Sequence, residues 1–482
     1  MARALSRTLL AVVVIVVVAA AALGAYAAYV ASRPRAVTLT VVTYTGAPAQ
    51  PLLDLAAQEF ERLHPGVKVD VVAYPYGQYI SNELTVLQAG GSQYDVVTYT
   101  TTTVGLIAPY LLPLNSSVIN ESDILPPDLL AAGIYRNPLT GESEWVGVPI
   151  QTDGIVLLYN KTLFDNATLQ GEFYEEYGVN LTPSSWSSWT DVLYADQFFT
   201  SHHVTRYGLL LYTDIPDITD SFLIVFGPSY VSNSTLNCGN PAGVIGFGTA
   251  FMGCVPSWWG HPFPPPAVNS SAGVEALETL KELASYGPSP AQLQVSFNNE
   301  LQLLATPGVT PGVFGYIGML PSVANASYVK DIGIAPLPGG LIRIGLTYIG
   351  VSKYSAHKKL ALEFLQLVAS PRFQEQAFLR TLVFPSSVSA YRALISNSSV
   401  PAYMREWLSA VLEAADKPEA ILAPYVPVLM TSTMKTQVAT YIYNYVVGQT
   451  SDPAAALQQV AKAYVTALET YYSTASTSTT GG

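Results

Sequence analysis

The chain has 482 residues, of which 50% are hydrophobic and only 12% are Asp, Glu, Lys or Arg, so it can bury a large core and is not intrinsically disordered. Its 22 basic and 34 acidic residues give a formal charge of −12, which excludes a general basic surface for nucleic acid. We expect several compact units or one large two-lobed body that binds no nucleic acid.

The first predicted element is an uncharged hydrophobic segment, Leu9 to Ser32. At about 1.5 Å per residue, a helix of this length crosses a hydrocarbon core of roughly 30 Å. Ala25, Tyr26 and Ala27 also resemble the small-residue site at which a secretory signal is cleaved. We predict that residues 1–33 anchor the protein in a membrane, with secretion after signal cleavage as the alternative.

Strands and helices then alternate. Residues 37–43 and 67–71 have the pattern of strands, and a helical repeat between them ends at His64, Pro65 and Gly66. A helix over 78–89 and a third strand over 94–100 follow. This order predicts a parallel sheet with right-handed crossovers.

Ligands of such sheets bind beyond the carboxyl ends of the strands. The residues at these ends are Tyr44 and Thr45, residues 74–76, and residues 100–103. The sequence therefore predicts a binding site formed by hydroxyl groups and aromatic rings.

Asparagine usage indicates on which side of the membrane the body lies. Nine of the 16 asparagines stand in Asn-x-Ser/Thr sequons, where chance would supply roughly two to three. We predict glycosylation of these nine residues on an exported surface. They are Asn115, Asn120, Asn160, Asn166, Asn180, Asn233, Asn269, Asn325 and Asn397.

Cys238 and Cys254 are the two cysteines of the chain, in a glycine-rich stretch. Outside the cell such a pair favours a disulfide. A zinc site would need four ligands, and no C-x-x-C motif or histidine cluster accompanies them. We expect no metal and no cofactor.

Helical periodicity returns in the second half of the chain. It predicts a helix after Asn269 and further helices over residues 358–369, 402–415 and 453–471. Residues 473–482 are rich in Ser and Thr, and we expect this tail to be disordered.

Sequence motifs of common enzyme classes are missing, including the nucleophile elbow, the P-loop and H-E-x-x-H. Asp214, Asp217 and Asp220 lack the spacing and the glycine of a calcium loop. Two carboxylates brought together by the fold could act as in glycosidases, which keeps an enzyme as an alternative.

Six segments in order resemble family 1 extracellular solute-binding proteins, the maltose-binding-protein-like receptors of ABC importers. The clearest is GVPIQTDGIVLLYNKTLFD, residues 147–165. Others are YDVVTYT at 94–100, SWSSWTDVL at 185–193, DIGIAPLPGG at 331–340 and YIGVSKYSAHKKLALEFLQLVASPRFQEQ at 348–376. The closing helix around 452–468 also agrees, so the resemblance spans residues 37–472.

The resemblance implies an α/β periplasmic-binding-protein-like fold of type II, with a ligand cleft between two lobes that close by hinge motion. The first lobe would comprise residues 37–150 and 346–384, and the second residues 155–344 and 387–472. Three hinge crossings would lie near 149–154, 345–350 and 383–387.

The resemblance also implies binding residues. A sugar-stacking aromatic position matches Tyr99, a charged pair matches Thr102 and Thr103, and an acidic contact matches Asp153. A contact in the second lobe falls near Asp217, with Asp220 close by in sequence. Two further stacking tryptophans of the family have no match, so the resemblance does not imply a maltodextrin ligand.

The residue types themselves favour a polar, uncharged ligand. Aspartates accept pairs of sugar hydroxyls, and flat aromatic rings cover the apolar faces of sugars. We add Trp258 and Trp259, beside Cys254, and Tyr348, beside the second crossing, as candidate contacts. Packing in the core is the alternative for each of these aromatic residues.

We therefore predict a monomeric, glycosylated receptor on the extracellular face of the cell, held by its N-terminal helix. It would capture a sugar or oligosaccharide for the permease subunits of an ABC transporter, without catalysis. The alternatives are an exported glycan-degrading enzyme that uses Asp153 and Asp217, or a sensory ectodomain.

Overall fold

The structure is a computed structural model that describes residues 14, 16–21, 37–117, 119–215, 217–239, 253–416, 419–422 and 432–478. Most of the predicted anchor, Leu9 to Ser32, lies outside these residues. Among the helices of the described residues, none has the length and apolar character needed to span a bilayer.

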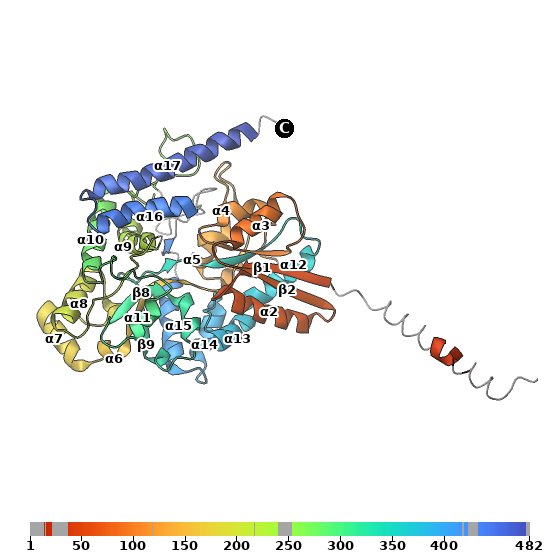
Figure 1. The fold of residues 1–482 in the computed structure, drawn as a ribbon, viewed down its shortest axis with the longest axis horizontal. Helices are drawn as coiled ribbons and strands as arrows, with labels where there is room; N and C mark the ends of the chain where they lie inside the picture. Colours follow the sequence, from red (N-terminus) through yellow and green to blue (C-terminus); the bar gives the residue numbers. More distant parts are fainter. Residues whose placement is uncertain are drawn as a thin grey trace, which may run out of the picture.

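The first lobe is built on a five-stranded sheet with the strand order β2-β1-β3-β11-β6. Figure 1 labels β1 and β2 of this sheet, with α2, α3 and α12 nearby. The three N-terminal strands are parallel, whereas β11 is antiparallel to β3 and to β6. The strands are β1 (Val37–Tyr44), β2 (Val67–Tyr74), β3 (Val96–Thr100), β6 (Val148–Pro149) and β11 (Thr347–Val351). The predicted parallel β-α-β-α-β unit is thus confirmed.

Helices α2 (Ala49–Leu63) and α3 (Tyr79–Gln88) connect these strands. Apolar residues recur along α2 at helical spacing, and Leu52, Leu53, Ala56 and Phe60 are buried against the sheet. The helix ends at Leu63, just before the Pro65-Gly66 pair, because neither residue supports a helix.

The second lobe contains another five-stranded sheet, ordered β12-β10-β7-β8, with β9 paired to β7. Its strands are β7 (Gly154–Asn160), β8 (Gly312–Tyr316), β9 (Ile332–Ala335), β10 (Arg343–Ile344) and β12 (Ile421–Leu422). The helices that belong to this part of the chain are α6 (Lys161–Phe164), α7 (Ala167–Tyr177), α8 (Trp189–Ser201), α9 (Ile218–Ser232), α10 (Ser271–Ser285) and α11 (Glu300–Ala305).

Shorter elements complete the first lobe, and the C-terminal helices follow. The shorter elements are α4 (Val104–Ile107), α5 (Pro126–Asp128) and a hairpin of β4 (Ile134–Arg136) and β5 (Ser143–Trp145). The later helices are α12 (Lys358–Ala369), α13 (Pro371–Thr381), α14 (Val388–Ser396), α15 (Ala402–Ala415), α16 (Ser432–Val446) and α17 (Pro453–Ser478). Of these, α12 and α13 contact the first lobe, and α15, α16 and α17 contact the second.

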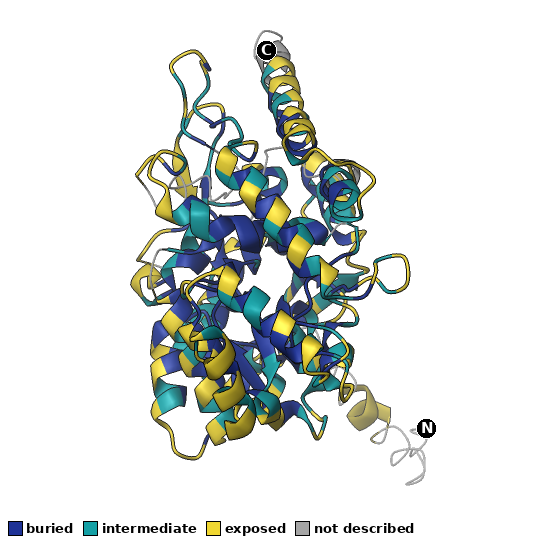
Figure 2. Ribbon diagram, turned by 90° about the vertical axis from the view of Figure 1, so that its left-hand side faces the viewer, coloured by how far each residue is buried: buried dark blue, intermediate teal, exposed yellow. Residues whose placement is uncertain are grey.

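Buried residues lie beneath helices whose outer faces are exposed (Figure 2). One cluster of buried side chains extends from the first sheet through the second lobe, and another fills the space between the first sheet and α2. Helix α17 packs on α16 and α10 through Leu457, Val460 and Leu468.

The expectation that the C-terminal tail is disordered is wrong for residues 473–478, because α17 continues through Ser478. The hydroxyls of Ser473 and Thr474 donate to the carbonyl of Thr470, at 2.8 and 3.0 Å, and so satisfy their polar groups within the helix. Residues 479–482 lie outside the described chain.

Two connections cross directly between the two sheets, from β6 to β7 and from β10 to β11. The backbone N–H of Ile150 donates to Thr347 at 3.0 Å, and that of Thr152 donates to Phe384 at 3.1 Å. All three predicted crossings therefore lie side by side. Their action as hinges, and the predicted lobe boundaries, stay predictions.

Candidate binding site between the lobes

Three tyrosines gather at the carboxyl edge of the first sheet. Tyr44 ends β1, Tyr76 follows β2, and Tyr79 begins α3. Their ring centroids lie 5.0 to 5.6 Å apart. The Tyr44 hydroxyl also forms a 2.7 Å hydrogen bond with Oγ1 of Thr347 on β11, which fixes its ring.

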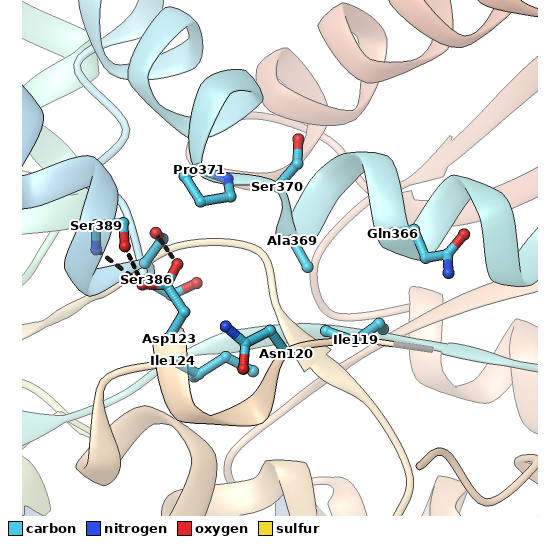
Figure 3. A pocket seen from close by; sticks show the side chains of 11 residues that line it. Ile119, Asn120, Asp123, Ile124, Gln366, Ala369, Ser370, Pro371, Ser386 and Ser389 are labelled. Atoms are coloured by element: carbon cyan, nitrogen blue, oxygen red, sulfur yellow. Dashed lines mark hydrogen bonds between the residues drawn. The ribbon is translucent and has the colours of Figure 1, made fainter. Parts of the chain in front are cut away.

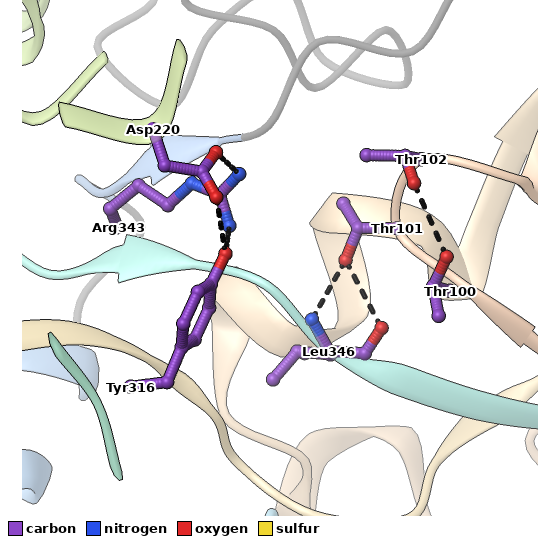
Figure 4. A network of polar contacts seen from close by, with 7 residues as sticks. All are labelled: Thr100, Thr101, Thr102, Asp220, Tyr316, Arg343 and Leu346. Atoms are coloured by element: carbon purple, nitrogen blue, oxygen red, sulfur yellow. Dashed lines mark hydrogen bonds and ion pairs between the residues drawn. The ribbon is translucent and has the colours of Figure 1, made fainter. Parts of the chain in front are cut away.

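The second lobe contributes an ion pair with a tyrosine beside it. Arg343 on β10 forms a salt bridge with Asp220 on α9. The hydroxyl of Tyr316 donates to Oδ2 of Asp220 at 2.8 Å and accepts from Nη1 of Arg343 at 2.5 Å. Figure 4 shows these three side chains pointing at one another. Because Arg343 is buried, its charge has lost most of its solvation. The stability of the ion pair therefore depends on these hydrogen bonds.

Asp153 lies at the start of β7, where the chain has just crossed between the sheets. Its Oδ1 accepts the backbone N–H groups of Gly154 and Gly318, at 2.7 and 2.8 Å. The residue is only 7% exposed, and burial raises the pKa of its carboxyl to about 7, against the lowering effect of these two hydrogen bonds. The carboxyl therefore titrates near neutral pH.

The two groups interact electrostatically across the lobes. Tyr76 lies within electrostatic reach of Asp217, Asp220, Arg343 and Asp153. Tyr44 likewise lies within reach of Asp153. We call this set of residues the interlobe site: Tyr44, Tyr76, Tyr79, Asp153, Asp217, Asp220, Tyr316 and Arg343. Tyr76 is 54% exposed, so the site is open to solvent on the side of the first lobe.

A threonine turn follows β3 at the edge of the first lobe. Oγ1 of Thr100 lies 3.3 Å from that of Thr102 and 3.1 Å from that of Thr103. Thr101 bonds the backbone of Leu346 (Figure 4). Thr102 and Thr103 are half-buried, and Thr45, after β1, is exposed.

Tyr99 and Tyr348 pack inside the first lobe. Their rings stack at 5.2 Å, and both residues are fully buried. Their hydroxyls donate to the carbonyls of Ala132 and Asp128, at 3.0 and 2.6 Å. Each side chain thus has the contacts expected of a residue packed in the core, which is the alternative to a ligand contact. A ligand contact by either residue stays a prediction.

The two adjacent tryptophans have different environments. Trp258 is 75% exposed, whereas Trp259 is buried and its Nε1 donates to the carbonyl of Phe263 at 2.6 Å. The two rings meet edge to face at 5.7 Å. Trp259 thus has the contacts of a packed residue, and a ligand contact by either tryptophan stays a prediction.

A cavity of about 280 Å³ lies elsewhere, beside the third crossing (Figure 3). Asp123 is on its wall and bonds Ser387 and Ser389 at the start of α14. None of the interlobe residues lines this cavity. Asp123 accepts three hydrogen bonds there, from the Ser387 and Ser389 hydroxyls and the Ser389 backbone N–H.

The predicted disulfide between Cys238 and Cys254 is confirmed, with a Cα–Cα distance of 5.6 Å. Closing a loop of this size stabilises a protein by about 3 kcal/mol in the chain-entropy account. We expect the Cys238→Ser/Cys254→Ser variant to lose about that free energy of unfolding in a urea titration. An unchanged urea midpoint would show that the disulfide does not contribute to the free energy of unfolding.

The nine sequons face outward. Eight of their asparagines are exposed, and Asn160 is half-buried. In Asn166, Asn233 and Asn397 the side-chain Oδ1 accepts the backbone N–H of the residue two positions later, at 2.9 to 3.0 Å. The surface position agrees with glycosylation, and the modification itself stays a prediction.

Sequence reasoning missed Arg343, Tyr316 and Glu300. Arg343 carried a weak signal, because it is a lone basic residue in the apolar run between residues 332 and 348. Glu300 is completely buried, and the Tyr212 hydroxyl donates to its Oε2. Tyr76 stood at a predicted strand end but was not singled out. Arg343, Tyr316 and Glu300 all interact electrostatically with Asp153, which the sequence analysis did identify.

Gly318 is required by the close approach of Asp153. A Cβ at this position would lie 2.1 Å from Oδ2 of Asp153. We expect Gly318→Ala to displace the carboxylate of Asp153 and to lower the free energy of unfolding by about 1 to 3 kcal/mol. The substitution should also weaken the binding of a solute beside Asp153.

Gly171 provides the matched control for this substitution. It lies inside α7 with no atom within 4 Å of an added Cβ, so Gly171→Ala should stabilise the protein by about 0.5 to 1 kcal/mol. Urea unfolding of both variants checks the pair. Equal effects at the two positions would contradict the proposed contact.

Solved structures with the same architecture are similar to the chain over most of its length. The maltose-bound MalE3 of T. maritima is 17% identical, with 89% of this chain and 98% of that chain covered and a TM-score of 0.63. The GacH receptor of Streptomyces glaucescens is 20% identical, with coverages of 90% and 99% and a TM-score of 0.62. A ribitol-bound solute-binding protein from Agrobacterium radiobacter K84 is 17% identical, with coverages of 90% and 98% and a TM-score of 0.63.

These likenesses confirm the two-lobed α/β periplasmic-binding-protein fold. No curated relative matches the chain. The family model described as "Bacterial extracellular solute-binding protein" matches residues 45–375, which is more than half of the sequence. The chain therefore belongs to the family of bacterial extracellular solute-binding proteins.

Proposed function

We propose that the protein captures a sugar or polyol at the interlobe site, outside the membrane, and delivers it to the permease of an ABC transporter. Family membership supports the role of a binding protein. Among the structures with a similar fold are complexes with maltose, acarbose and ribitol. The electrostatic proximity of the tyrosine cluster to Asp153 and Asp217 carries the proposal.

The chemistry of the site suits a polyhydroxylated solute. The half-exposed ring of Tyr76 offers a flat face for the C–H groups of a sugar ring. Asp217 and Asp220 offer carboxylate oxygens to hydroxyl donors, and Asp153 has a second oxygen that takes neither of its two backbone bonds. We also propose that Thr102 and Thr103, half-buried in the turn after β3, supply neutral hydroxyls to the solute.

Motion of the lobes would control access. The site takes residues from both lobes, and three adjacent segments connect them. Rotation about these segments would separate Tyr76 from Asp217 and admit the solute. Closure would then bury the solute between the tyrosine cluster and the aspartates.

The location outside the membrane completes the proposal. The uncharged segment from Leu9 to Ser32 would tether the protein, or would be removed as a signal. Glycans on the exposed asparagines would hydrate a surface that is poor in charge. The protein would act as a monomer beside its permease.

A thermal-shift screen of the full-length protein in detergent tests the function. The panel would contain monosaccharides, oligosaccharides and polyols, with amino acids and short peptides for comparison. A solute at 100 times its dissociation constant should add about 2.7 kcal/mol of stability. A shift with peptides alone, and with no sugar or polyol, would refute the proposal.

A further inference from the structure

We infer that a glycan linked to Asn120 places its first sugar in the cavity beside the third crossing and holds this crossing on the first lobe. The inference rests on the glycosylation that the proposed function includes, and it gives one of these glycans a binding site on its own chain. Of the nine sequon asparagines, Asn120 is the one that lines this cavity.

The side chain of Asn120 faces the cavity with the atom to which a glycan is attached. N-linked sugars are bonded to Nδ2 of the sequon asparagine. Figure 3 shows Nδ2 of Asn120 on the side of Asp123 and Ser386, whereas its oxygen is turned away from them. The hydroxyl of Ser122, the third residue of the sequon, donates to that oxygen at 2.8 Å and supports this orientation. A sugar bonded to Nδ2 would therefore enter the cavity.

The size of the cavity suits a single sugar ring. Its volume is about 280 Å³, just below the range of about 300 to 1,000 Å³ that is typical of sites for whole small-molecule ligands. Asn120 itself is exposed. The remaining sugars of the glycan can therefore extend into solvent while the first one is enclosed.

The walls offer both kinds of contact that a sugar makes. Ile119, Ile124 and Pro371 supply apolar surface for the C–H groups of the ring. Gln366 and Ser370 supply polar groups for its hydroxyls. A mixed lining of this kind suits a sugar better than it suits a wholly apolar ligand.

Asp123, the one charged residue among those that line the cavity, has room for one more donor. Its Oδ1 accepts two hydrogen bonds from Ser389, and its Oδ2 accepts one from Ser387. Because each carboxylate oxygen has two lone pairs, Oδ2 keeps one acceptor position. A hydroxyl or amide N–H of the sugar could donate there.

The cavity lies where two parts of the first lobe hold the third crossing. From one part, the backbone N–H of Leu125 donates to the carbonyl of Ser386 at 2.9 Å. From the other, Oε1 of Gln374 on α13 accepts the backbone N–H groups of Ser386 and Ser387, both at 2.8 Å. The lining residues come from 119–124, from the start of α13 and from the crossing itself. A sugar there would contact all three and so restrain the crossing.

Site-specific trimming of the glycans tests the position of the sugar. The full-length protein would be purified in detergent from a host whose N-linked glycans begin with two N-acetylglucosamine residues. An endoglycosidase that cuts between these two sugars would be added, and mass spectrometry would follow cleavage at Asn120 and Asn115. We expect trimming at Asn120 to be at least about tenfold slower than at Asn115 in the folded protein, and equally fast in proteolytic peptides.

Hydrogen exchange measures the effect on the crossing. Ser122→Ala removes the sequon of Asn120, and Ser117→Ala is the matched control that removes the sequon of Asn115. Each serine hydroxyl donates to Oδ1 of its asparagine, so both variants lose the same kind of bond. We expect the backbone amides of residues 386–391 to exchange at least about tenfold faster in Ser122→Ala and at the wild-type rate in Ser117→Ala. Wild-type protein from a host without glycosylation should exchange like Ser122→Ala.

The outcomes separate this inference from the proposed function. Absence of a glycan from Asn120 would overturn the inference, and so would a glycan there that is trimmed as fast as the one on Asn115. Unchanged exchange in Ser122→Ala would show that the sugar does not hold the crossing. None of these results bears on solute capture, which the thermal-shift screen tests separately, and a failure of every solute in that screen would leave the position of the sugar unaffected.

Discussion

The protein should be more stable at pH 5 than at pH 8, the reverse of ordinary acid denaturation. Five carboxyl groups are buried and have raised pKa values, because burial penalises their charged form. They are Glu83, Asp128, Asp153, Asp196 and Glu300. Each accepts only one or two hydrogen bonds, and none is part of a salt bridge.

The direction of the effect follows from proton linkage. A carboxyl with a raised folded-state pKa keeps its proton in the folded state at a pH where the unfolded chain has lost it. The folded state is therefore favoured at low pH, and stability falls as the pH rises from about 4 toward the folded-state pKa. For Asp153, with a folded-state pKa of about 7, the loss between pH 5 and pH 8 is about 3 kcal/mol.

Urea unfolding at a series of pH values measures this dependence. The Asp153→Asn variant should show a flatter profile than the wild type and greater stability at pH 8, since asparagine keeps an oxygen for Gly154 and Gly318. Asp70→Asn on the surface should leave the slope unchanged. A wild-type stability that rises from pH 5 to pH 8 would contradict the assignment of these buried carboxyls as protonated.

Replacing Arg343 should destabilise the protein by about 4 kcal/mol. Its guanidinium is buried, bonds Asp220 and Tyr316, and lies within electrostatic reach of Asp153. Arg343→Met keeps most of the apolar volume but leaves Asp220 without its counter-ion. The cost comes mainly from the carboxylate that remains in a largely dry site.

A double-mutant cycle separates this cost from loss of packing. Arg343→Met combined with Asp220→Asn should recover at least about 2 kcal/mol relative to Arg343→Met alone, because no uncompensated charge remains. Arg392→Met is the matched control: its partner Asp416 is 3.4 Å away and both side chains are exposed, so less than about 1 kcal/mol should be lost. Strict additivity at Arg343 and Asp220 would show that the pair is not coupled.

Local patterns in the sequence were sufficient to predict much of the fold. Alternating valines in β1 and β2, and the helical repeat that Pro65-Gly66 ends, depend only on neighbours in the chain. The same is true of α12 and α15, whose predicted limits agree with the structure. The resemblance to a known family then supplied the two-lobed arrangement, which no local pattern contains.

The interlobe site was less predictable, because it depends on contacts between distant residues. Arg343 and Asp220 are 123 positions apart, and the packing of α9 against β10 brings them together. Likewise, the family resemblance that implied Tyr99 as a ligand contact does not reveal that its ring stacks on Tyr348, which lies on β11. The burial of these side chains and the pairing of their charges could therefore be identified only from the structure.

One titration tests the central claim, that solute binds between the tyrosine cluster and the aspartates. The best solute from the thermal-shift screen would be titrated by calorimetry into the wild type, Tyr76→Ala and Tyr174→Ala. The two tyrosines are equally exposed, at 54% and 56%, but Tyr174 lies on α7, away from the site. We predict that Tyr76→Ala weakens binding at least about tenfold while Tyr174→Ala leaves it unchanged. Unchanged affinity in Tyr76→Ala would place the solute elsewhere and contradict the account.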